Sequence, residues 1–547
     1  MRTLRHILAL ALCLNVFTTG LAVRPRSTSG HTAGSDRDNP ALWQPASHSM
    51  LTKAVRPGSY ATHDVVRTGS PKYPVALVEF KDIRFIIKDK EQLTERYDNM
   101  FNQHGYTHDA PPVYFSPTES KEVHISPWAG CVRDYFHDQS FGKFDPQFDI
   151  IGPIRLSKNS SDYGKGNDNL RALMRELLDS ISVRGIDLTP YTRNGNMDGF
   201  MFLYAGKGEN YVGSNTYAIY PKADTIKNWK GIGNIRYACA CELFWDSDSI
   251  IDGVGITCHE FAHLLGLPDF YNTLSGYNSV HVEAMGQWSL MDYGNYANQG
   301  FTPSALTAFE RFSLGWMDIE DIDAPGHYTL TDITKEPNPA QGIHTAYRIR
   351  TTDNEDNCII LENHIRTGWN KFNGGEGLMV TALAYQQNNW ASNLVNTGYS
   401  AESKRYHILA ADNIYTHDTE WADLFPWNGI DSITINGTPR LASLGNNAIY
   451  SIYNIRWDDA KISFYAGKER ESEVERHQAA GVSMSVQGDY LIIRAPAGSP
   501  VSIHELSGRT VLETVMETGT LSVPVTGSGG FRIVRCAGTT RKLRIEN

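Results

Sequence analysis

The 547-residue chain has few cysteines, no long apolar run beyond its N-terminus and no excess of basic residues. Seven cysteines are too sparse for a fold built on disulfides. Because the one long apolar stretch is N-terminal, we expect no membrane-spanning segment in the mature chain. The 50 Lys and Arg against 61 Asp and Glu leave a net charge of −11. Phosphate binding needs a basic face, so this balance argues against a nucleic-acid partner.

Two catalytic signatures are also missing. The chain has no Gly-x-Ser-x-Gly elbow, which argues against a serine hydrolase of that type. It has no Gly-x-x-x-x-Gly-Lys-Ser/Thr loop for nucleotide phosphates either. What is present is an ordinary mixture, 41% hydrophobic and 20% charged, which can bury a full core. At about 150 residues per domain, the length predicts three to four domains.

The first residues are typical of an export signal. Arg2, Arg5 and His6 precede an apolar run that ends in small residues. We therefore expect residues 1–22 to be a signal peptide, and the protein to be secreted or cell-surface. Residues 23–70 are rich in Ser, Thr and Gly without apolar periodicity, which is typical of a pro-segment. They contain no cysteine, so a pro-segment thiol is not available there to cap a metal.

Helical and strand patterns are mixed between residues 71 and 320. Residues 73–80 and 199–204 are short apolar runs that suit buried strands. Apolar residues between 170 and 181 recur at helical spacing. The region 71–320 is therefore predicted to be an α+β domain.

Two β-rich regions follow. Residues 321–467 contain short alternating runs broken by Asn, Gly and Pro, which predicts a β-rich domain. Residues 468–480 are charged and poor in apolar side chains, as in a linker. Residues 481–547 have short strands with glycine turns, which predicts a small β-sandwich.

A His-Glu-x-x-His motif is the strongest chemical signal in the chain. His259 and His263 are four residues apart, so one face of a helix presents both to a common ion. Glu260, beside the first histidine, is placed to take a proton from the attacking water. Gly266 permits a left-handed residue that ends the helix and folds the chain back. Asp269 can then return as a third metal ligand, and three protein ligands are typical of catalytic zinc.

Alternatives remain for the third ligand. Glu283 lies 20 residues after His263, and His281 is a further candidate. We favour Asp269, because Gly266 supplies the turn that this residue needs.

The surroundings of the motif give two further expectations. Asp248 or Asp252 is expected to cap the N-terminus of the helix. Cys239, Cys241 and Cys258 offer an alternative thiolate cluster, but we favour buried or disulfide-bonded cysteines.

Residues 288–294, Trp-Ser-Leu-Met-Asp-Tyr-Gly, resemble the methionine turn of metzincin-type peptidases. Met291 is then expected to pack beneath the metal without binding it. Tyr293 is a candidate to reach the zinc or to donate to the oxyanion, and a buried structural role is the alternative.

Together these motifs resemble the immune-inhibitor-A-like metallopeptidases over residues 71–320. The segments that carry this resemblance are residues 75–82, 132–136, 140–144, 204–206, 259–271, 289–294 and 314–316. The resemblance implies a zincin- or metzincin-like α+β catalytic domain in a secreted zinc endopeptidase made with a pro-segment. It implies protein or peptide substrates, zinc ligands at His259, His263 and Asp269, and Glu260 as the catalytic base.

One loop departs from the family pattern. Relatives often carry an Asp- and Gly-rich loop suited to calcium before the residues equivalent to 204–206. Here Asn194, Asn196 and Asp198 are the candidate Ca2+ ligands, with Arg193 among them. Calcium prefers several carboxylate oxygens, and this loop has one carboxylate, so the loop is a poor fit to calcium.

Residues 501–509, Val-Ser-Ile-His-Glu-Leu-Ser-Gly-Arg, are followed by a basic strand near the end of the chain. With these features, residues 481–547 resemble the sorting domains of the type IX secretion route, which implies contact with secretion machinery. A carbohydrate- or protein-binding β-module is the alternative. For the whole protein, the alternative to a peptidase is a catalytically inactive secreted adhesion or binding protein on the same fold. The presence of Glu260 beside all the candidate ligands argues against that alternative.

Overall fold

The computed structural model describes residues 57–58, 60–164, 167–213, 216–273, 284–352, 357–398, 400, 403–468, 482–487, 490–505, 509–524, 530–536 and 539–545. The chain divides into two units, Met1–Gly467 and Lys468–Asn547. Among the described residues, no helix is both long and apolar enough to cross a membrane.

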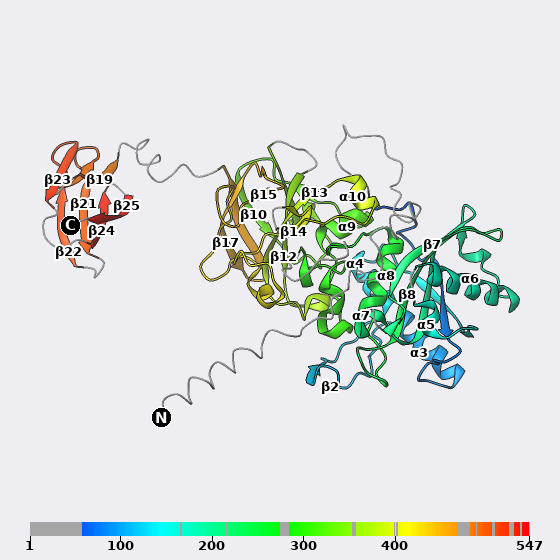
Figure 1. The fold of residues 1–547 in the computed structure, drawn as a ribbon. Coiled ribbons are helices and arrows are strands. Elements are labelled where there is room, and N and C mark those ends of the chain that lie inside the picture. Colours follow the sequence, from blue (N-terminus) through cyan, green and yellow to red (C-terminus); the bar gives the residue numbers. More distant parts are fainter. Residues whose placement is uncertain are drawn as a thin grey trace, which may run out of the picture. The chain divides into compact units, whose positions relative to one another are not determined.

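A six-stranded mixed sheet is the core of the N-terminal part of the first unit, which lies at the right in Figure 1. Its strand order is β4-β1-β6-β8-β7, with the short β5 paired to β6. Neighbours are parallel from β4 to β8, whereas β7 is antiparallel to β8. The strands are β1 Lys72–Glu79, β4 Gln147–Arg155, β5 Thr192–Arg193, β6 Asn196–Lys207, β7 Lys222–Trp229 and β8 Gly233–Leu243. The buried strands expected at residues 73–80 and 199–204 are confirmed by β1 and β6.

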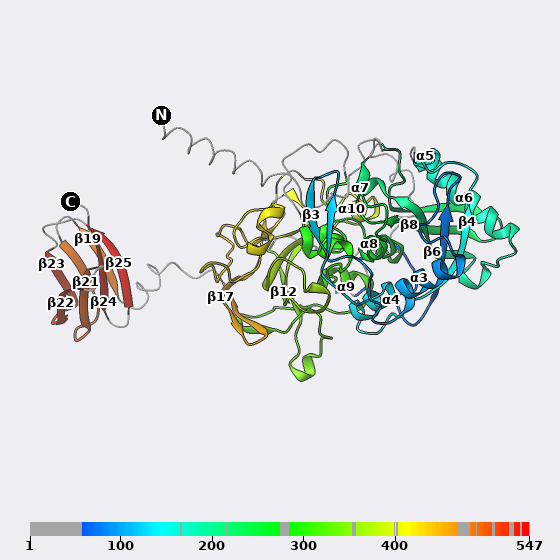
Figure 2. The ribbon, with the colours of Figure 1, turned by 90° about the horizontal axis from the view of Figure 1, so that it is seen from below.

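Helices cover both faces of this sheet. The ring of Tyr73 meets Phe261 of α8 at 4.9 Å, and Phe80, directly after β1, meets Tyr163 of α5 at 5.8 Å. Side chains seven positions apart on an extended chain point to opposite faces, so α8 and α5 lie on different sides. Figure 2 shows α3 and α4 on one side and α5 and α6 on the other. The helices are α3 Lys90–Asn102, α4 Val132–Gln139, α5 Ser160–Tyr163, α6 Asn167–Val183, α7 Glu209–Val212, α8 Gly255–Leu265 and α9 Ala308–Leu314.

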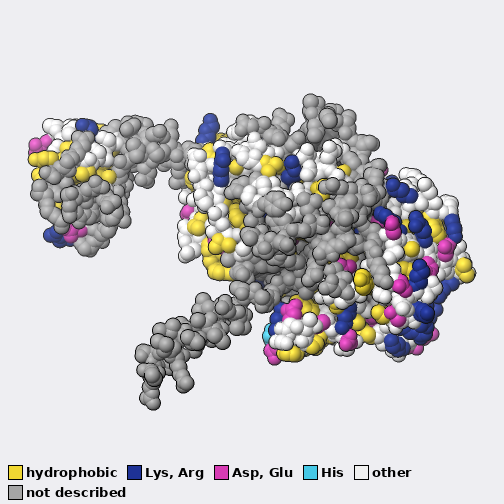
Figure 3. All heavy atoms as spheres, in the orientation of Figure 1, with side chains coloured by type: hydrophobic (Ala, Val, Ile, Leu, Met, Phe, Trp, Pro, Cys, Tyr) yellow, Lys and Arg dark blue, Asp and Glu magenta, His cyan; other side chains and the backbone are white. Residues whose placement is uncertain are grey.

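The apolar periodicity at residues 170–181 is confirmed by α6. The apolar residues that recur at helical spacing are buried, whereas Val183 at the end of the helix is exposed. The buried residues are Leu170, Leu173, Met174, Leu177, Leu178 and Ile181. On the face drawn in Figure 3, basic and acidic side chains are intermixed over the right-hand part of the first unit, where α6 lies in Figure 1.

Shorter elements complete the N-terminal part of the unit. They are the hairpin β2 Val113–Ser116 and β3 Lys121–His124, and the 3-10 turns η1 Thr189–Tyr191, η3 Gly286–Trp288 and η4 Tyr293–Gly300.

The rest of the first unit is β-rich, as expected for residues 321–467. A five-stranded sheet has the order β14-β13-β12-β11-β9, a three-stranded sheet has the order β10-β18-β17, and β15 pairs with β16. The strands are β9 Glu320–Asp321, β10 Gly326–Leu330, β11 Ala346–Arg350, β12 Asn357–His364, β13 Gly377–Ala384, β14 Tyr406–Ile408, β15 Ala442–Ser443, β16 Asn446–Asn447, β17 Ser451–Asp458 and β18 Lys461–Gly467. Between them lie α10 Gln387–Ala391 and the turns η5 Pro339–Gln341, η6 Gly368–Asn370 and η8 His417–Ala422.

The five-stranded sheet takes part in two hydrophobic cores. On β12, Ile359 and Leu361 join the core that contains β10, β17 and β18. The alternate residues Cys358 and Ile360 join the core of the six-stranded sheet and its helices. Since successive side chains of a strand point to opposite faces, this sheet is packed on both sides. The β-rich part is therefore joined to the N-terminal part by a continuous core.

The second unit consists of two antiparallel sheets around a core of its own. One has the order β19-β20-β23 and the other β22-β21-β24-β25. Leu491 and Ile493 of the first sheet share this core with Val501, Ile503 and Val534 of the second. The strands are β19 Ser483–Gln487, β20 Tyr490–Arg494, β21 Pro500–Glu505, β22 Thr510–Val515, β23 Thr520–Pro524, β24 Gly530–Cys536 and β25 Thr539–Ile545.

Residues 60–67, here called the N-terminal strap, lie within the segment expected to be a pro-segment, yet they contact the end of α8. The amide and the hydroxyl of Thr62 both donate to the carbonyl oxygen of Gly266, at 3.0 and 3.1 Å. Nε of Arg67 donates to the carbonyl oxygen of Leu265 at 2.8 Å. The last carbonyls of a helix have no partner within the helix, so the strap satisfies groups that α8 leaves open.

We expect Arg67→Ala to lower the melting temperature by a few degrees, because a hydrogen bond from a charged donor contributes about 1.5–3 kcal/mol. The measurement is thermal unfolding of the metal-free protein, with the exposed Arg84→Ala as the matched control. Equal melting temperatures for the two variants would show that the strap does not stabilise the end of α8.

Candidate metal centre

The helix that carries the His-Glu-x-x-His motif is buried along its whole length. The expectation that Asp248 or Asp252 caps it was wrong. The helix begins after Val254, and no side chain caps it. The carboxylate of Asp252 instead accepts hydrogen bonds from its neighbour Gly253 at 2.8 Å and from the Tyr211 hydroxyl at 3.0 and 3.1 Å. Asp248 is exposed and pairs with a lysine.

The expected turn after the helix is present. Gly266 has φ 104° and ψ 19°, the left-handed conformation that glycine adopts at least cost. A Cβ atom here would lie 3.1 Å from the backbone nitrogens of Thr62 and His63 in the strap. Both the backbone conformation and the close approach of the strap therefore favour glycine at this position.

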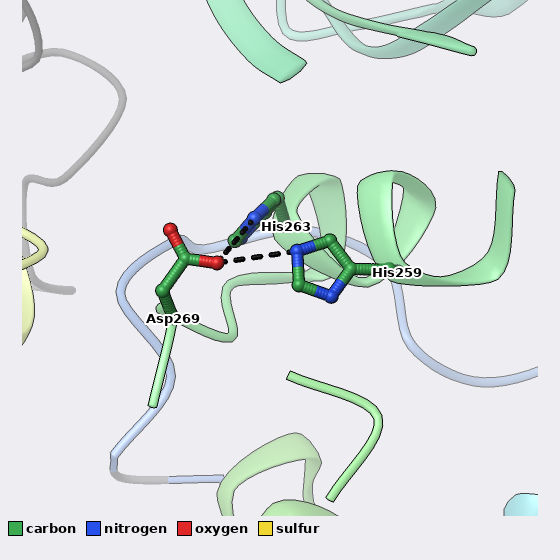
Figure 4. A group of neighbouring side chains, drawn as sticks. All are labelled: His259, His263 and Asp269. Carbon is green, nitrogen blue, oxygen red and sulfur yellow. Dashed lines mark ion pairs between the residues drawn. The ribbon is translucent and has the colours of Figure 1, made fainter. Parts of the chain in front are cut away.

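The turn brings the three expected ligands together (Figure 4). Nε2 of His259 and Nε2 of His263 each lie 3.2 Å from Oδ1 of Asp269. All three side chains are buried, and their candidate ligand atoms lie within 4.8 Å of one another. In the part of the chain that the structure describes, this is the one such group of at least three His, Cys, Asp or Glu residues.

Hydrogen bonds fix which ring nitrogen of each histidine faces the centre. Nδ1 of His259 lies 2.8 Å from the carbonyl oxygen of Leu290, and Nδ1 of His263 lies 2.8 Å from that of Leu267. A carbonyl oxygen only accepts, so each Nδ1 carries the proton and each neutral ring has its lone pair on Nε2. Two lone pairs and a carboxylate oxygen then converge in a buried space. They repel one another unless a cation lies between them, and this donor set suits zinc.

The proposed third ligand is favoured in its ionised form. Burial raises the pKa of Asp269, but in the metal-free site His263 and His259, when they take up a second proton, outweigh that effect and bring the pKa well below its usual range. An ionised carboxylate is the form that binds a metal. The two alternatives for the third ligand, His281 and Glu283, lie outside the described residues.

Glu260 is buried beside the first ligand, with 5% of its surface exposed. Its charge acts on Tyr220, a residue that no local motif indicated. Burial raises the pKa of Tyr220 well above its usual value, and Tyr296, Asp269 and Glu260 raise it further. Tyr220 precedes β7 in the chain, so its proximity to the two acidic groups depends on how β7 and α8 pack together.

The expected methionine turn lies directly against the ligands. The carbonyl oxygen of Met291 accepts a hydrogen bond from the amide of Phe270 at 2.8 Å, and the preceding carbonyl, of Leu290, is the one that orients His259. Met291 itself is fully buried. Tyr293 begins η4 and has 9% of its surface exposed, and its catalytic role stays a prediction.

A buried carboxylate supports this turn, and sequence reasoning missed it. Glu310 of α9 accepts hydrogen bonds from the hydroxyl of Ser289 at 2.6 Å and from the amide of Thr307 at 2.7 Å. Burial raises the pKa of Glu310 to about 7, although these hydrogen bonds lower it. The turn is therefore attached to α9 by a polar contact in the core.

In the loop that we considered for calcium, two arginines bind the one carboxylate. Oδ2 of Asp198 accepts from Arg193 at 2.7 Å, and Oδ1 accepts from Arg236 at 3.2 Å. The side-chain oxygen of Asn196 accepts from the amide of Asn234. A cation at this loop would have to displace both guanidinium groups from its one carboxylate.

The six cysteines after the N-terminal run are buried and free. Cys239 and Cys241 lie two positions apart on β8, and Cys258 lies on α8. Burial, the largest cause, raises the pKa of all three thiols. A buried thiol is the protonated, inert form, which agrees with a packing role.

Residues 60–317 match the family described as "Immune inhibitor A peptidase M6, catalytic domain". Two relatives are similar over about the same length of chain. "Pre-pro-metalloprotease PrtV" of Vibrio cholerae serotype O1 is 26% identical in an alignment of 312 residues that covers 47% of this chain. "Immune inhibitor A" of Bacillus thuringiensis subsp. alesti is 25% identical in an alignment of 297 residues that covers 46% of this chain.

These matches support the immune inhibitor A peptidase family. The family match begins at the strap and ends just after α9. The alignments cover only 32% and 41% of the length of the two relatives.

A solved structure of PorZ, a surface component of the type-IX secretion system of Porphyromonas gingivalis, is 13% identical over 36% of this chain and 22% of that chain. Its TM-score of 0.11 is too low to support a common fold.

The buried carboxyl before α8 predicts a pH dependence. Burial raises the pKa of Asp252 to about 8, against hydrogen bonds from Gly253, Tyr211 and Cys241. In the unfolded chain this pKa is about 3.9, so folding takes up a proton at intermediate pH. The free energy of unfolding therefore falls as the pH rises from about 4 to about 8, by up to about 1.4 kcal/mol per pH unit.

The test compares melting temperatures of wild type and Asp252→Asn between pH 5 and pH 8, in metal-free buffer. We expect the variant to gain stability relative to wild type as the pH rises. Asp248→Asn, at an exposed carboxylate nearby, should show a constant difference. A constant difference for Asp252→Asn as well would contradict the prediction.

The ligand geometry predicts stabilisation by metal. Zinc at 100 times its dissociation constant should stabilise the folded chain by about 2.7 kcal/mol. Addition of EDTA should remove this increment from the melting temperature. We expect Asp269→Ala to abolish the increment and Glu283→Ala to keep it. If Glu283→Ala abolished the zinc-dependent increment and Asp269→Ala kept it, Glu283 would be the third ligand.

Proposed function

We propose that this chain is a secreted, zinc-dependent endopeptidase that hydrolyses protein substrates, with Glu260 as the general base. The convergence of the His259 and His263 lone pairs on Asp269 carries this proposal. Similarity to proteins named as a metalloprotease and as immune inhibitor A supports it.

His259, His263 and Asp269 would hold the zinc ion. Three protein ligands are typical of catalytic zinc, whereas structural sites have four. Among the described residues, no fourth His, Cys, Asp or Glu joins this group. A bound zinc ion supplies a Lewis acid that lowers the pKa of water and polarises a carbonyl oxygen.

Glu260 performs the proton transfers in this proposal. It follows His259 in α8 and is buried, so its carboxylate acts in a medium of low dielectric. It takes the proton from the attacking water and later delivers it to the nitrogen of the leaving amine. Tyr293 is our candidate to donate a hydrogen bond to the oxyanion that forms on the substrate carbonyl.

The remaining parts of the chain fit an exported enzyme. Residues 1–22 would direct export, and residues 481–547 would direct sorting by the secretion machinery. The strap is buried against α8, with the exposed fraction of Tyr60, Ala61 and Thr62 below a tenth. We therefore place the cut that removes the pro-segment before Tyr60.

The decisive variant is Glu260→Gln. It should keep the zinc, because Glu260 is not among the proposed ligands, and lose several orders of magnitude in kcat. The measurement combines zinc content with casein digestion, and Glu95→Gln, at an exposed position on α3, is the matched control. A Glu260→Gln protein that digests casein as fast as wild type would show that another mechanism operates. A wild type that digests no casein would favour the inactive binding protein.

A further inference from the structure

The carboxylate of Asp269 is held from outside the part of the chain that the family match covers. The side-chain NH2 of Asn393 donates to Oδ2 of Asp269 at 2.6 Å, and the Asn393 side-chain oxygen accepts from the Asp269 amide at 2.8 Å. A backbone amide only donates, which fixes the orientation of the asparagine amide. Asn393 therefore forms a two-point contact with this one residue.

We propose that Asn393 is a positioning residue that presents Asp269 to zinc through Oδ1 alone. This inference rests on the proposed zinc site. With Oδ2 bound by Asn393, Oδ1 is the carboxylate oxygen that faces the two imidazoles. The amide thus decides which oxygen is the ligand and prevents the carboxylate from rotating to bind with both.

The backbone around Asn393 is built for this contact. Asn393 has φ 53°, a left-handed conformation that asparagine tolerates better than most residues. Its carbonyl oxygen accepts a hydrogen bond from the hydroxyl of Thr273, four residues after Asp269. The side chain itself is 4% exposed, so water does not compete for its bonds.

A second asparagine in the same loop holds the chain next to the ligand. The side-chain NH2 of Asn396 donates to the carbonyl oxygens of Phe270 at 2.7 Å and Tyr406 at 2.6 Å. Its side-chain oxygen accepts from the amide of Tyr406 at 2.9 Å. Residues 392–396, here called the clamp loop, thereby attach the ligand segment to β14.

The clamp loop is anchored in the core. Trp390 of α10 is 1% exposed, and its ring packs against Phe309 of α9 and against Tyr385. The side-chain amide of Asn389 donates to the carbonyl oxygen of Leu394 at 2.9 Å. The β-rich part of the chain is therefore a component of the metal centre, and a catalytic segment that ended at residue 320 would lack its clamp.

The test measures metal binding by the full chain. Asn393→Gly removes both bonds and suits the left-handed backbone, and Asn393→Ala removes the same bonds but keeps a Cβ atom. Asn413→Gly is the matched control, since Asn413 has φ 58° and is exposed. The readouts are zinc affinity by competition with a chelator, the absorption spectrum of the cobalt-substituted protein, and the melting temperature of the metal-free form.

We expect Asn393→Gly to weaken zinc binding about 10- to 100-fold and to alter the cobalt spectrum, because outer hydrogen bonds to a ligand have effects of this size. Asn393→Ala should weaken zinc binding as much as Asn393→Gly does, and Asn413→Gly should match wild type. The metal-free melting temperature of Asn393→Gly should stay within a few degrees of wild type.

Unchanged zinc affinity and an unchanged cobalt spectrum in the Asn393 variants would overturn the proposal. So would a lower metal-free melting temperature with normal affinity in the folded protein, which indicates a merely structural role. If Asn393→Gly does not fold, Asn393→Ala decides by the same criteria. A wild type that binds no zinc overturns the zinc site and the clamp together. If zinc binds but Glu260→Gln retains full activity, only the proposed reaction fails.

Discussion

Two hydrogen bonds determine what this site can do. Each ligand histidine directs Nδ1 at a backbone carbonyl oxygen, of Leu290 for His259 and of Leu267 for His263. The proton must lie on Nδ1, so the lone pairs on Nε2 are directed at the carboxylate of Asp269. Without these carbonyls, either ring could rotate or change tautomer and would cease to be a preformed ligand. The arrangement is electrostatically unfavourable unless a cation is present, which is why it fits a metal.

The two carbonyls come from turns that other parts of the chain hold in place. The Leu267 carbonyl follows the left-handed turn at Gly266, whose own carbonyl is bonded by the strap. The Leu290 carbonyl belongs to the methionine turn, which Glu310 attaches to α9. The third ligand is held by the clamp loop, which follows α10. The site is thus assembled by a polar network in which each proposed ligand side chain is held by a hydrogen bond on the side away from the centre, and such networks specify one geometry.

This dependence changes how the chain is divided into parts. The α+β segment carries the three proposed ligands and Glu260, but the candidate site is completed by the strap before it and by the clamp loop after it. The five-stranded sheet packs on both faces, with Cys358 and Ile360 in the core of the six-stranded sheet. Apolar burial on this scale joins the β-rich part to the α+β part in a single folded unit.

The parts of the fold that were predicted from the sequence are those that local patterns determine. An apolar run predicted the strand β1, and apolar residues at helical spacing predicted the helix α6. The glycine at position 266 predicted the turn that ends α8 and leads to Asp269. The prediction of an acidic cap on α8 was wrong. The sequence alone does not tell at which residue the helix begins, nor which other donors a nearby carboxylate can reach in the folded chain. Asp252 is bonded to Tyr211, and that contact depends on tertiary packing.

The sequence by itself determined the chemistry of the ligands, since residues four apart on a helix share a face and a glycine after it allows the return of Asp269. Tertiary structure alone decided which nitrogen and which oxygen of those ligands face the centre. The carbonyl that orients His259 comes 31 residues later, and the amide that holds Asp269 comes 124 residues later. No spacing rule connects such positions, because only the packed cores of the chain bring them within hydrogen-bonding distance.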